Sequence, residues 1–202
     1  MSGNDVQARY IAPVASDDNG ISAAATLSGA GNLTIGGALA DGGSVTLTDA
    51  RNVIITSAGD DRGDTFTVTG TDEAGNAQTE AITGANAGVA TGTSYFTTIT
   101  QIACSGATTG NVEAGTGTAV AAQVTVNRVR LRGLQFVGNT TGGAVEVRTT
   151  GATGSIIYKF DANNVDDTVY PDIPDGGIVG SAGAYVVYTQ TNLVSLTVFY
   201  EG

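Results

Sequence analysis

The side chains that most often carry out chemistry in proteins are scarce in this sequence. It has no histidine and a single cysteine, Cys104. Without histidine, the usual catalytic triads, the commonest metal ligand and the usual proton shuttle near neutral pH are excluded. Cys104 ends an apolar run at residues 102–104. Because the chain has no histidine that could act as its base, we interpret Cys104 as a small core residue. These residue types do not predict an enzyme.

Acidic residues gather in three segments that also have the composition of turns. Oxygen ligands in loops are what calcium prefers, but none of the segments has the spacing of an EF-hand loop. We therefore expect carboxylates that cap turns, with one bound cation as the alternative, and we predict no cofactor. Arg62-Gly63-Asp64 also matches the integrin-binding tripeptide, and it is equally ordinary turn chemistry. The three acidic segments are Asp17-Asp18-Asn19, residues 60–64 and residues 72–76.

The elements that would position any site are strands. Residues 65–71 alternate strictly between threonine and apolar or glycine positions, which is typical of a half-buried strand. Residues 52–57 and 77–83 have strand composition on either side of it. The stretch 51–84 therefore predicts a three-strand antiparallel meander, and no helix of any length is predicted. The interior residues of this meander are expected to be Ile54, Phe66, Val68 and Ile82.

Similar short strands, spaced by about 8–12 residues, continue along the chain and predict an all-β fold. We expect an immunoglobulin-like β-sandwich over residues 25–122, followed by a second small β-sandwich or jelly-roll-like unit over residues 123–202. Residues 1–24 contain a proline, a turn cluster and few apolar side chains. They are expected to form an extended N-terminal arm that becomes ordered against a neighbouring subunit.

The charge of the chain limits its partners. A formal net charge of -11 disfavours nucleic acid and anionic membranes as ligands. No apolar run approaches the ~20 residues that span a bilayer, and no signal peptide is recognised, so we expect a protein made in a cytoplasm. Residues 1–124 include three basic and twelve acidic residues, a net charge of -9. Residues 125–202 include five basic and seven acidic residues, a net charge of -2. This asymmetry favours two units with different neighbours.

Two groups of residues are the best candidates for an interface. Three arginines alternate along residues 128–132, which puts them on one face of a strand, opposite Val129 and Leu131. One interpretation is a solvated face with local carboxylate partners; the other is a docking stripe for an acidic surface. In the N-terminal arm, the few apolar side chains are the expected anchors. The candidate interface residues are Arg128, Arg130 and Arg132 on the strand and Tyr10, Ile11 and Val14 in the arm.

The predicted meander consists of the segments VIITSAGD at residues 53–60, TFTVTGTD at residues 65–72 and QTEAITG at residues 78–84. As a string it resembles a β-sandwich module of tailed-bacteriophage virion proteins, and the similarity covers residues 50–118. Residues 194–200 are also similar in style to phage β proteins. Such modules recur in capsid decoration, neck and tail components, so the resemblance implies a structural family rather than one position in the particle.

Together these observations predict a non-enzymatic virion structural protein, made in the host cytoplasm and located in the virion. The expected role is a capsid decoration (cement) protein that bridges capsomers, with the major capsid protein or other virion proteins as partners. Such proteins often occupy local threefold positions, so the resemblance implies a homotrimer. Two alternatives stay open: a neck, tail or fibre-base component, and a bacterial surface adhesin or carbohydrate-binding module. A sugar site would use exposed Trp or Tyr platforms, and this chain has no tryptophan.

Overall fold

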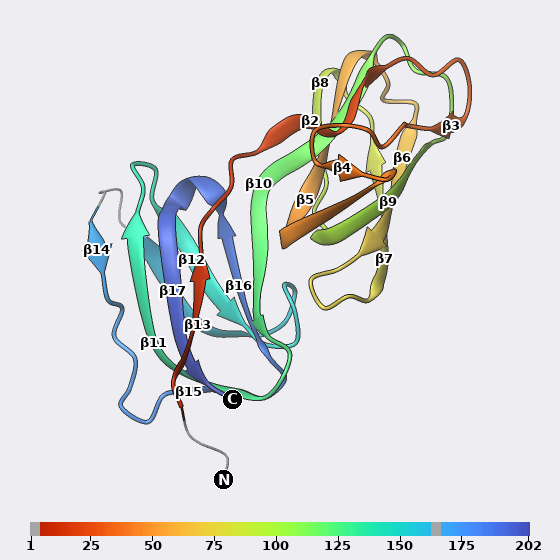
Figure 1. Ribbon diagram of the computed structural model, residues 1–202. Coiled ribbons are helices and arrows are strands. Elements are labelled where there is room, and N and C mark those ends of the chain that lie inside the picture. Colours follow the sequence, from red (N-terminus) through yellow and green to blue (C-terminus); the bar gives the residue numbers. More distant parts are fainter. Residues whose placement is uncertain (1–4, 163–166) are drawn as a thin grey trace. The chain divides into compact units, whose positions relative to one another are not determined.

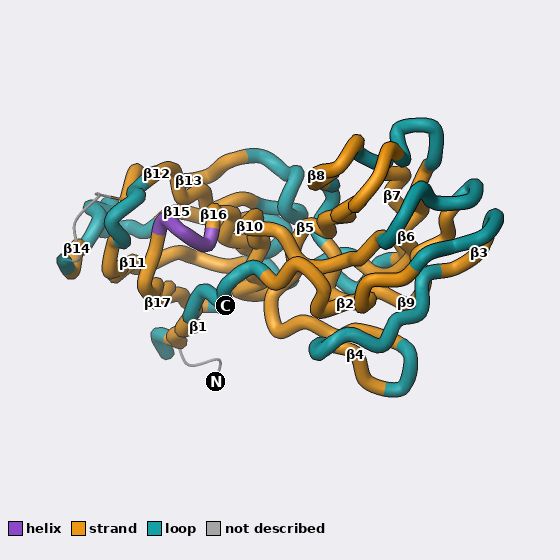
Figure 2. The backbone as a smooth tube through the Cα atoms, turned by 90° about the horizontal axis from the view of Figure 1, so that it is seen from above, coloured by secondary structure: helices purple, strands orange, loops and turns teal. Residues whose placement is uncertain are grey.

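The computed structural model describes residues 5–162 and 167–202 and divides the chain into two compact units. The central unit consists of residues 16–118, and the terminal unit combines residues 1–15 with residues 119–202. Both are built from antiparallel strands (Figure 1), and Figure 2 shows a single short helical segment, η1 (Gln190–Asn192), in the described chain. The prediction of an all-β sandwich protein is confirmed. No helix among the described residues is long and apolar enough to cross a lipid bilayer.

Two layers of strands make up the central unit. Its strands are β2 (Asp17–Ala25), β3 (Gly31–Asn32), β4 (Ala40–Asp41), β5 (Ser44–Asp60), β6 (Thr65–Thr71), β7 (Ala77–Thr83), β8 (Asn86–Thr91), β9 (Phe96–Cys104) and the first half of β10 (Val112–Thr125). One layer has the order β7-β6-β9-β5, with β3 paired to β9 and β4 paired to β5. In the other layer β8, the second half of β5, β10 and β2 follow one another.

Strand β5 belongs to both layers of the central unit. It is 17 residues long, and residues 50–55 are buried without interruption. Its first half pairs with β9, where Val45 lies opposite Ile99, and its second half pairs with β8, where Ile55 lies opposite Ala90. A strand that switches layers is covered on both faces where it crosses, which explains why burial does not alternate there.

The meander predicted over residues 51–84 is present only in part. β6 and β7 have the predicted bounds and pair along their full length. β5, however, is not the neighbour of β6: β9 lies between them and places Cys104 opposite Phe66. Side-chain alternation specifies which face of a strand is buried but not which strand lies beside it. A strand from later in the chain therefore occupies the position that the sequence assigned to β5.

The core of the central unit is aliphatic with two phenylalanines. Phe66 and Val68 lie in it with no exposed surface, as predicted. The prediction for Ile54 is wrong. Ile54 is buried, but its neighbours Val53 and Ile55 belong to the core cluster and Ile54 does not. Adjacent residues of a strand point to opposite faces, so on a strand with both faces buried the sequence cannot specify which one faces this core.

The terminal unit is a second sandwich. One sheet has the order β1-β17-β11, with β14 and β15 both paired to the far edge of β11; the other has the order β13-β12-β16-β10. Aliphatic side chains and Phe136 from both sheets fill the space between them. The strands are β1 (Gln7–Ile11), β11 (Val129–Gly138), β12 (Gly143–Arg148), β13 (Ile156–Ala162), β14 (Thr168–Val169), β15 (Ile178–Gly180), β16 (Ala184–Thr189), β17 (Leu193–Glu201) and the second half of β10.

Residues 1–24 do not form a single arm in this structure. β1 is the outermost strand of its sheet in the terminal unit, and it pairs with β17 so that Ile11 lies opposite Leu196. β2 belongs to the central unit, where it pairs with β10. The unit boundaries therefore lie after residues 15 and 118 rather than after 24 and 122. A short alternating segment is enough for a strand where a sheet edge is open to it; the first four residues of the expected arm lie outside the described part.

Glycines mark places where two backbones come too close for a side chain. A Cβ atom on Gly70 would overlap the carbonyl oxygen of Thr98, and one on Gly59 would overlap that of Thr109. At both glycines the pairing register shifts, as it does at a β-bulge. Nothing lies within 4 Å of a Cβ atom on Gly63, in the corner between β5 and β6. Only some of the glycines are therefore required by packing.

The core assignment predicts the effect of substitutions on β6. Phe66→Ala removes a fully buried ring and should lower the free energy of unfolding of the central unit by about 3–5 kcal/mol. Thr67→Ala, at the next, half-buried position, should cost less than about 1 kcal/mol. Urea denaturation followed by circular dichroism measures both. Equal losses for the two variants would show that the register or the fold assigned to β6 is wrong.

The close backbone contact predicts a second pair of outcomes. Gly70→Ala should destabilise the central unit by about 1–3 kcal/mol or more, because backbone atoms of β9 must move to admit the methyl group. Gly63→Ala meets open space and serves as the matched control, with an effect within about 0.5 kcal/mol of zero. Thermal unfolding of the two variants compares them. If Gly70→Ala were as stable as Gly63→Ala, the pairing of β6 with β9 would be incorrect.

Candidate interaction surface

The terminal unit has an open sheet edge at β1. This strand pairs with β17 on one side and is the last described strand of its sheet on the other. Val6, Tyr10 and Val14, on and beside it, are 55%, 59% and 65% exposed. An unpaired edge leaves backbone N–H and C=O groups available to a strand of another chain, and exposed apolar side chains favour its burial. The β1 edge is the first part of the candidate surface.

A row of four side chains crosses the outer face of the same sheet. Tyr10 lies opposite Thr197 on β17, and Thr197 lies opposite Gln135 on β11. Tyr170 directly follows β14, and its hydroxyl oxygen accepts a hydrogen bond from Gln135 Nε2 at 2.9 Å. We call Tyr10, Thr197, Gln135 and Tyr170 the tyrosine row. It has an exposed ring at each end and neutral hydrogen-bonding groups between them.

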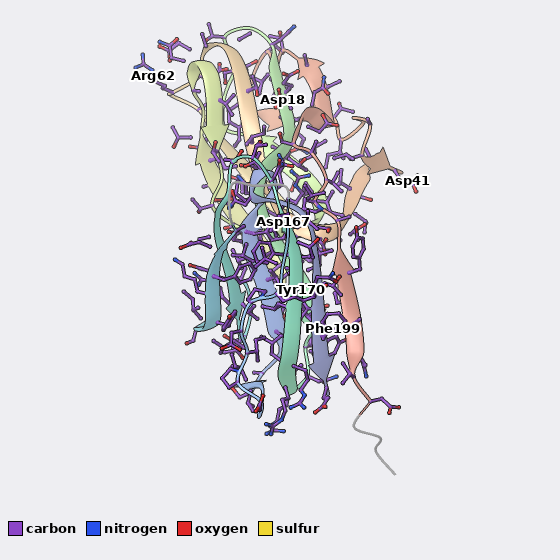
Figure 3. The ribbon with its side chains drawn as sticks, turned by 90° about the vertical axis from the view of Figure 1, so that its left-hand side faces the viewer. Asp18, Asp41, Arg62, Asp167, Tyr170 and Phe199 are labelled. Carbon is purple, nitrogen blue, oxygen red and sulfur yellow. The ribbon has the colours of Figure 1, made fainter. Side chains whose placement is uncertain are left out.

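A third ring lies next to the tyrosine row. Phe199 follows Thr197 by two residues on β17 and therefore points to the same face. It lies opposite Ala8 on β1 and Gly133 on β11, and it is half buried. Because Gly133 has no side chain, the ring is not covered from that strand. Figure 3 labels both Phe199 and Tyr170 on the terminal unit.

The loop that carries Tyr170 is fastened from both sheets of the terminal unit. On β13, the hydroxyl of Tyr158 donates a hydrogen bond to the backbone carbonyl of Asp172 at 2.7 Å, and burial raises the pKa of this tyrosine. On β11, two arginines donate to backbone carbonyls of residues 175–176. A loop held at three points presents Tyr170 with less conformational freedom than an unattached loop would.

The three predicted arginines have two kinds of surroundings. Arg128 is exposed and precedes β11. Arg130 and Arg132 are the two that bind the carbonyls of residues 175–176, and Arg132 also pairs with Glu201 at 3.3 Å. Two members of the predicted stripe are therefore engaged within their own chain, and a docking role for the third is still a prediction.

The three predicted anchors of the arm also separate. Tyr10 and Val14 are exposed and lie on the candidate surface. Ile11 is 1% exposed and packs in the core of the terminal unit, opposite Leu196. Ile11 is thus an anchor of β1 to its own sheet, which corrects its assignment to an interface between subunits. The sequence could not separate it from Tyr10, because the direction of alternation is fixed only when β1 pairs with β17.

The acidic segment 60–64 joins loops of the central unit. Asp61 is fully buried; its Oδ1 accepts a hydrogen bond from the Thr109 N–H at 2.6 Å, and its own N–H donates to Ala85 O at 2.9 Å. Arg62 donates two hydrogen bonds to Asp60, of 2.7 and 2.8 Å, and these lower the pKa of Asp60 to about 2. The basic member of the Arg-Gly-Asp sequence is therefore paired within the corner itself.

Among the described residues, no group of three or more Asp, Glu, Cys or His side chains lies close enough together to hold a metal ion. Cys104 lies in the core of the central unit and is 3% exposed. Burial raises the pKa of its thiol, which keeps it protonated at neutral pH.

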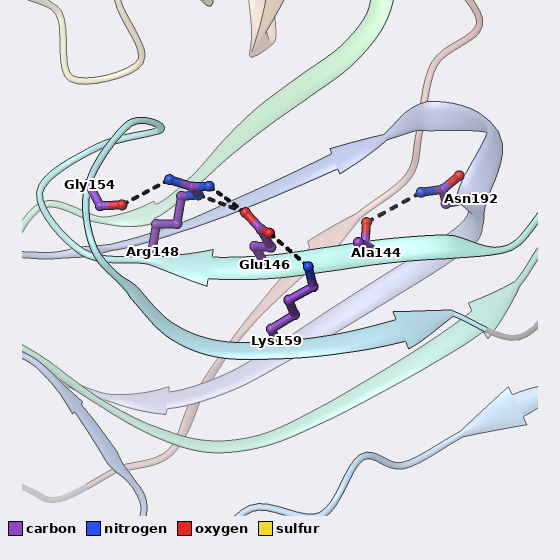
Figure 4. Close-up of polar contacts among 6 residues, drawn as sticks. All are labelled: Ala144, Glu146, Arg148, Gly154, Lys159 and Asn192. Atoms are coloured by element: carbon purple, nitrogen blue, oxygen red, sulfur yellow. Dashed lines mark hydrogen bonds and ion pairs between the residues drawn. The ribbon is translucent and has the colours of Figure 1, made fainter.

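A charged network lies on β12 and β13 of the terminal unit (Figure 4). Arg148 Nε donates to Glu146 Oε2 at 2.9 Å, and Lys159 pairs with Glu146 Oε1 at 3.3 Å. Arg148 also donates to the carbonyl of Gly154 at 3.0 Å. The hydrogen bonds from Arg148, followed by the contribution of Lys159, hold the pKa of Glu146 below its usual value. This network ties the turn after β12 to both strands.

The tyrosine row was not predicted from the sequence. Alternation along residues 194–200 places Thr197 and Phe199 on one face, but Tyr170 lies in a loop and carries no periodic signal. Comparison with known proteins finds no matching family model, no similar curated protein and no similar solved structure. The candidate surface is therefore defined by its geometry alone.

The Glu146 network predicts a pH dependence. A carboxyl whose pKa is lower in the folded than in the unfolded chain adds stability above its unfolded pKa, near 4.5, and loses it as the pH falls through the folded value. Glu146→Gln should therefore lower the stability of the terminal unit at pH 7 and flatten its decline below pH 4.5. Chemical denaturation across this range measures both effects. Asp161→Asn, at an exposed position on β13, is the control; equal pH profiles for the two variants would contradict the role of the network.

Proposed function

We propose that this chain is a non-enzymatic structural protein of a bacteriophage virion. Its role is that of a decoration (cement) protein, which stabilises the head by bridging capsomers as a homotrimer. The resemblance of residues 50–118 to virion β modules supports the assignment to a bacteriophage particle. The open edge of β1 supports attachment by strand addition. The protein is made in the host cytoplasm and acts in the virion, with the major capsid protein or another virion protein as its partner.

The single observation that carries the attachment mode is the open edge of β1 with its exposed apolar side chains. Edge strands of proteins that act alone are usually blunted by charges, prolines or bulges. Arg9 lies on β1 and Pro13 lies two residues after it, but apolar side chains flank the strand as well. Here Val6 and Val14 flank the strand and are more than half exposed. A strand from a neighbouring protein that pairs with β1 would extend the sheet at this edge and cover these valines. Attachment by strand addition suits a protein whose function is to hold others together.

The charge distribution supports different neighbours for the two units. The central unit has two basic and eleven acidic residues, a net charge of -9, whereas the terminal unit has six and eight, a net charge of -2. Central units of neighbouring copies repel one another, so contacts between copies or with a capsid are less costly through the terminal unit. The β1 edge and Arg128 belong to that unit. Attachment elsewhere in the particle, at a neck, tail or fibre base, would use the same edge.

The position in the particle is tested by the copy number of the chain. Particles of the phage that encodes it are purified, and the chain is quantified by mass spectrometry against the major capsid protein. A copy number that scales with the number of capsomers is the expected result. A single ring of copies would move the protein to the neck or tail, and its absence from intact particles would overturn the proposal.

The attachment mode is tested with lysines, which natural edge strands use to prevent pairing. The double variant Val6→Lys and Val14→Lys should reduce binding to particles that lack the chain by about tenfold, equivalent to ~1.4 kcal/mol. Val126→Lys is the matched control, because Val126 is 53% exposed in the same unit but lies on the connection between β10 and β11 rather than on or beside β1. Cosedimentation with particles measures the bound fraction. Equal binding by the double variant and the control would rule out the β1 edge as the attachment site.

A further inference from the structure

The tyrosine row has a chemistry that the proposed attachment through β1 does not use. Its ends are the rings of Tyr10 and Tyr170, which are 59% and 69% exposed. Its centre is the hydroxyl of Thr197 and the side-chain amide of Gln135. Three spacings of about 4.8 Å between neighbouring positions separate the two tyrosines by roughly 14 Å across the sheet. The row is therefore about as long as a short oligosaccharide.

The mixture of groups in the row indicates the kind of ligand. An apolar protein surface would bury the amide of Gln135 and the hydroxyl of Thr197 without new partners, which is costly. A sugar ring has an apolar face of C–H groups that stacks on an aromatic ring, and hydroxyls around its edge that both donate and accept hydrogen bonds. None of the four side chains is charged, so the row fits a neutral sugar rather than an anionic one. The chain's net charge of -11 also opposes an anionic ligand.

Tyr170, at one end of the row, is held in place by hydrogen bonds. Tyr170 is fixed through Gln135 at 2.9 Å, and its loop is fastened at Asp172 by Tyr158 and at residues 175–176 from β11. Little conformational freedom of Tyr170 is then left to lose on binding, which favours affinity. Phe199, half buried opposite Gly133, widens the apolar platform beside the polar centre.

We propose that the outer face of the β1-β17-β11 sheet is a binding site for neutral oligosaccharide chains, with Tyr10 and Tyr170 as stacking platforms and Gln135 and Thr197 as hydrogen-bonding groups. The site shares Tyr10 with the β1 edge, but Val6 and Val14, which the attachment test changes, are not part of the row. A structural protein with such a face would hold the particle against a polysaccharide surface while its β1 edge holds the particle itself.

The test uses the full chain in native gels cast with laminarin, galactomannan, dextran or soluble starch, and with alginate as an anionic control. Retardation by at least one neutral polysaccharide, and none by alginate, is the expected result. Titration with that polysaccharide then compares variants. Tyr170→Ala and Gln135→Ala should each weaken binding by about tenfold, whereas Tyr170→Phe, which keeps the ring, should lose less. Val126→Ala, exposed in the same unit but outside the row, should bind like the wild type.

Several results would overturn this proposal. Migration unchanged by all four neutral polysaccharides, or equal binding by Tyr170→Ala and Val126→Ala, would exclude the site. A loss as large for Tyr170→Phe as for Tyr170→Ala would exclude stacking as its basis. Self-association that depends on Tyr170 in sedimentation, without sugar binding, would assign the face to a second copy of the chain. Thermal unfolding of each variant distinguishes loss of binding from loss of folding, and none of these outcomes bears on particle attachment.

Discussion

The close approach of backbones at a few glycines is the constraint on which the central unit depends. At Gly59 and Gly70 any side chain would overlap a carbonyl oxygen of the neighbouring segment, and at both the pairing register shifts. Bulges bend and twist strands, and β5 has a further register shift against β9 between Thr46 and Arg51, close to where it passes from one layer to the other. The core between the layers consists mainly of isoleucine and valine side chains, with two phenylalanines. At these two positions glycine is a packing requirement rather than a sign of flexibility.

In the terminal unit, three long polar side chains hold one loop in place through hydrogen bonds. Arg130, Arg132 and Tyr158 direct their hydrogen bonds to backbone carbonyls of one loop rather than to solvent. That loop would otherwise leave carbonyls without partners along the open side of the sandwich. The cost of ordering three long side chains is offset by a fixed loop, and the fixed loop in turn positions Tyr170. Structural hydrogen bonds on one side of the loop thereby support an exposed surface on the other.

Much of the candidate surface could not have been predicted from the sequence. The arginine stripe of residues 128–132 assumed unbroken alternation, but the register between β11 and β17 shifts between Leu131 and Gly133, which puts Arg132 at a bulge. Tyr170 comes next to Gln135 only because β14, two residues long, pairs with β11. A strand this short has no periodicity, and its placement is decided by the edge that it meets. Long-range pairing therefore created the tyrosine row from four separate segments.

The sequence by itself determined the all-β class, the bounds of β6 and β7, and the burial of Phe66 and Val68. All of these follow from local alternation and turn composition, which act within a few residues. Only the tertiary structure decided that β9 separates β5 from β6, that β1 joins the terminal unit, and that Ile11 rather than Tyr10 faces the core. The reason is physical: alternation gives each strand two distinct faces, but the choice of neighbour and of inward face depends on pairing with strands far away in the chain.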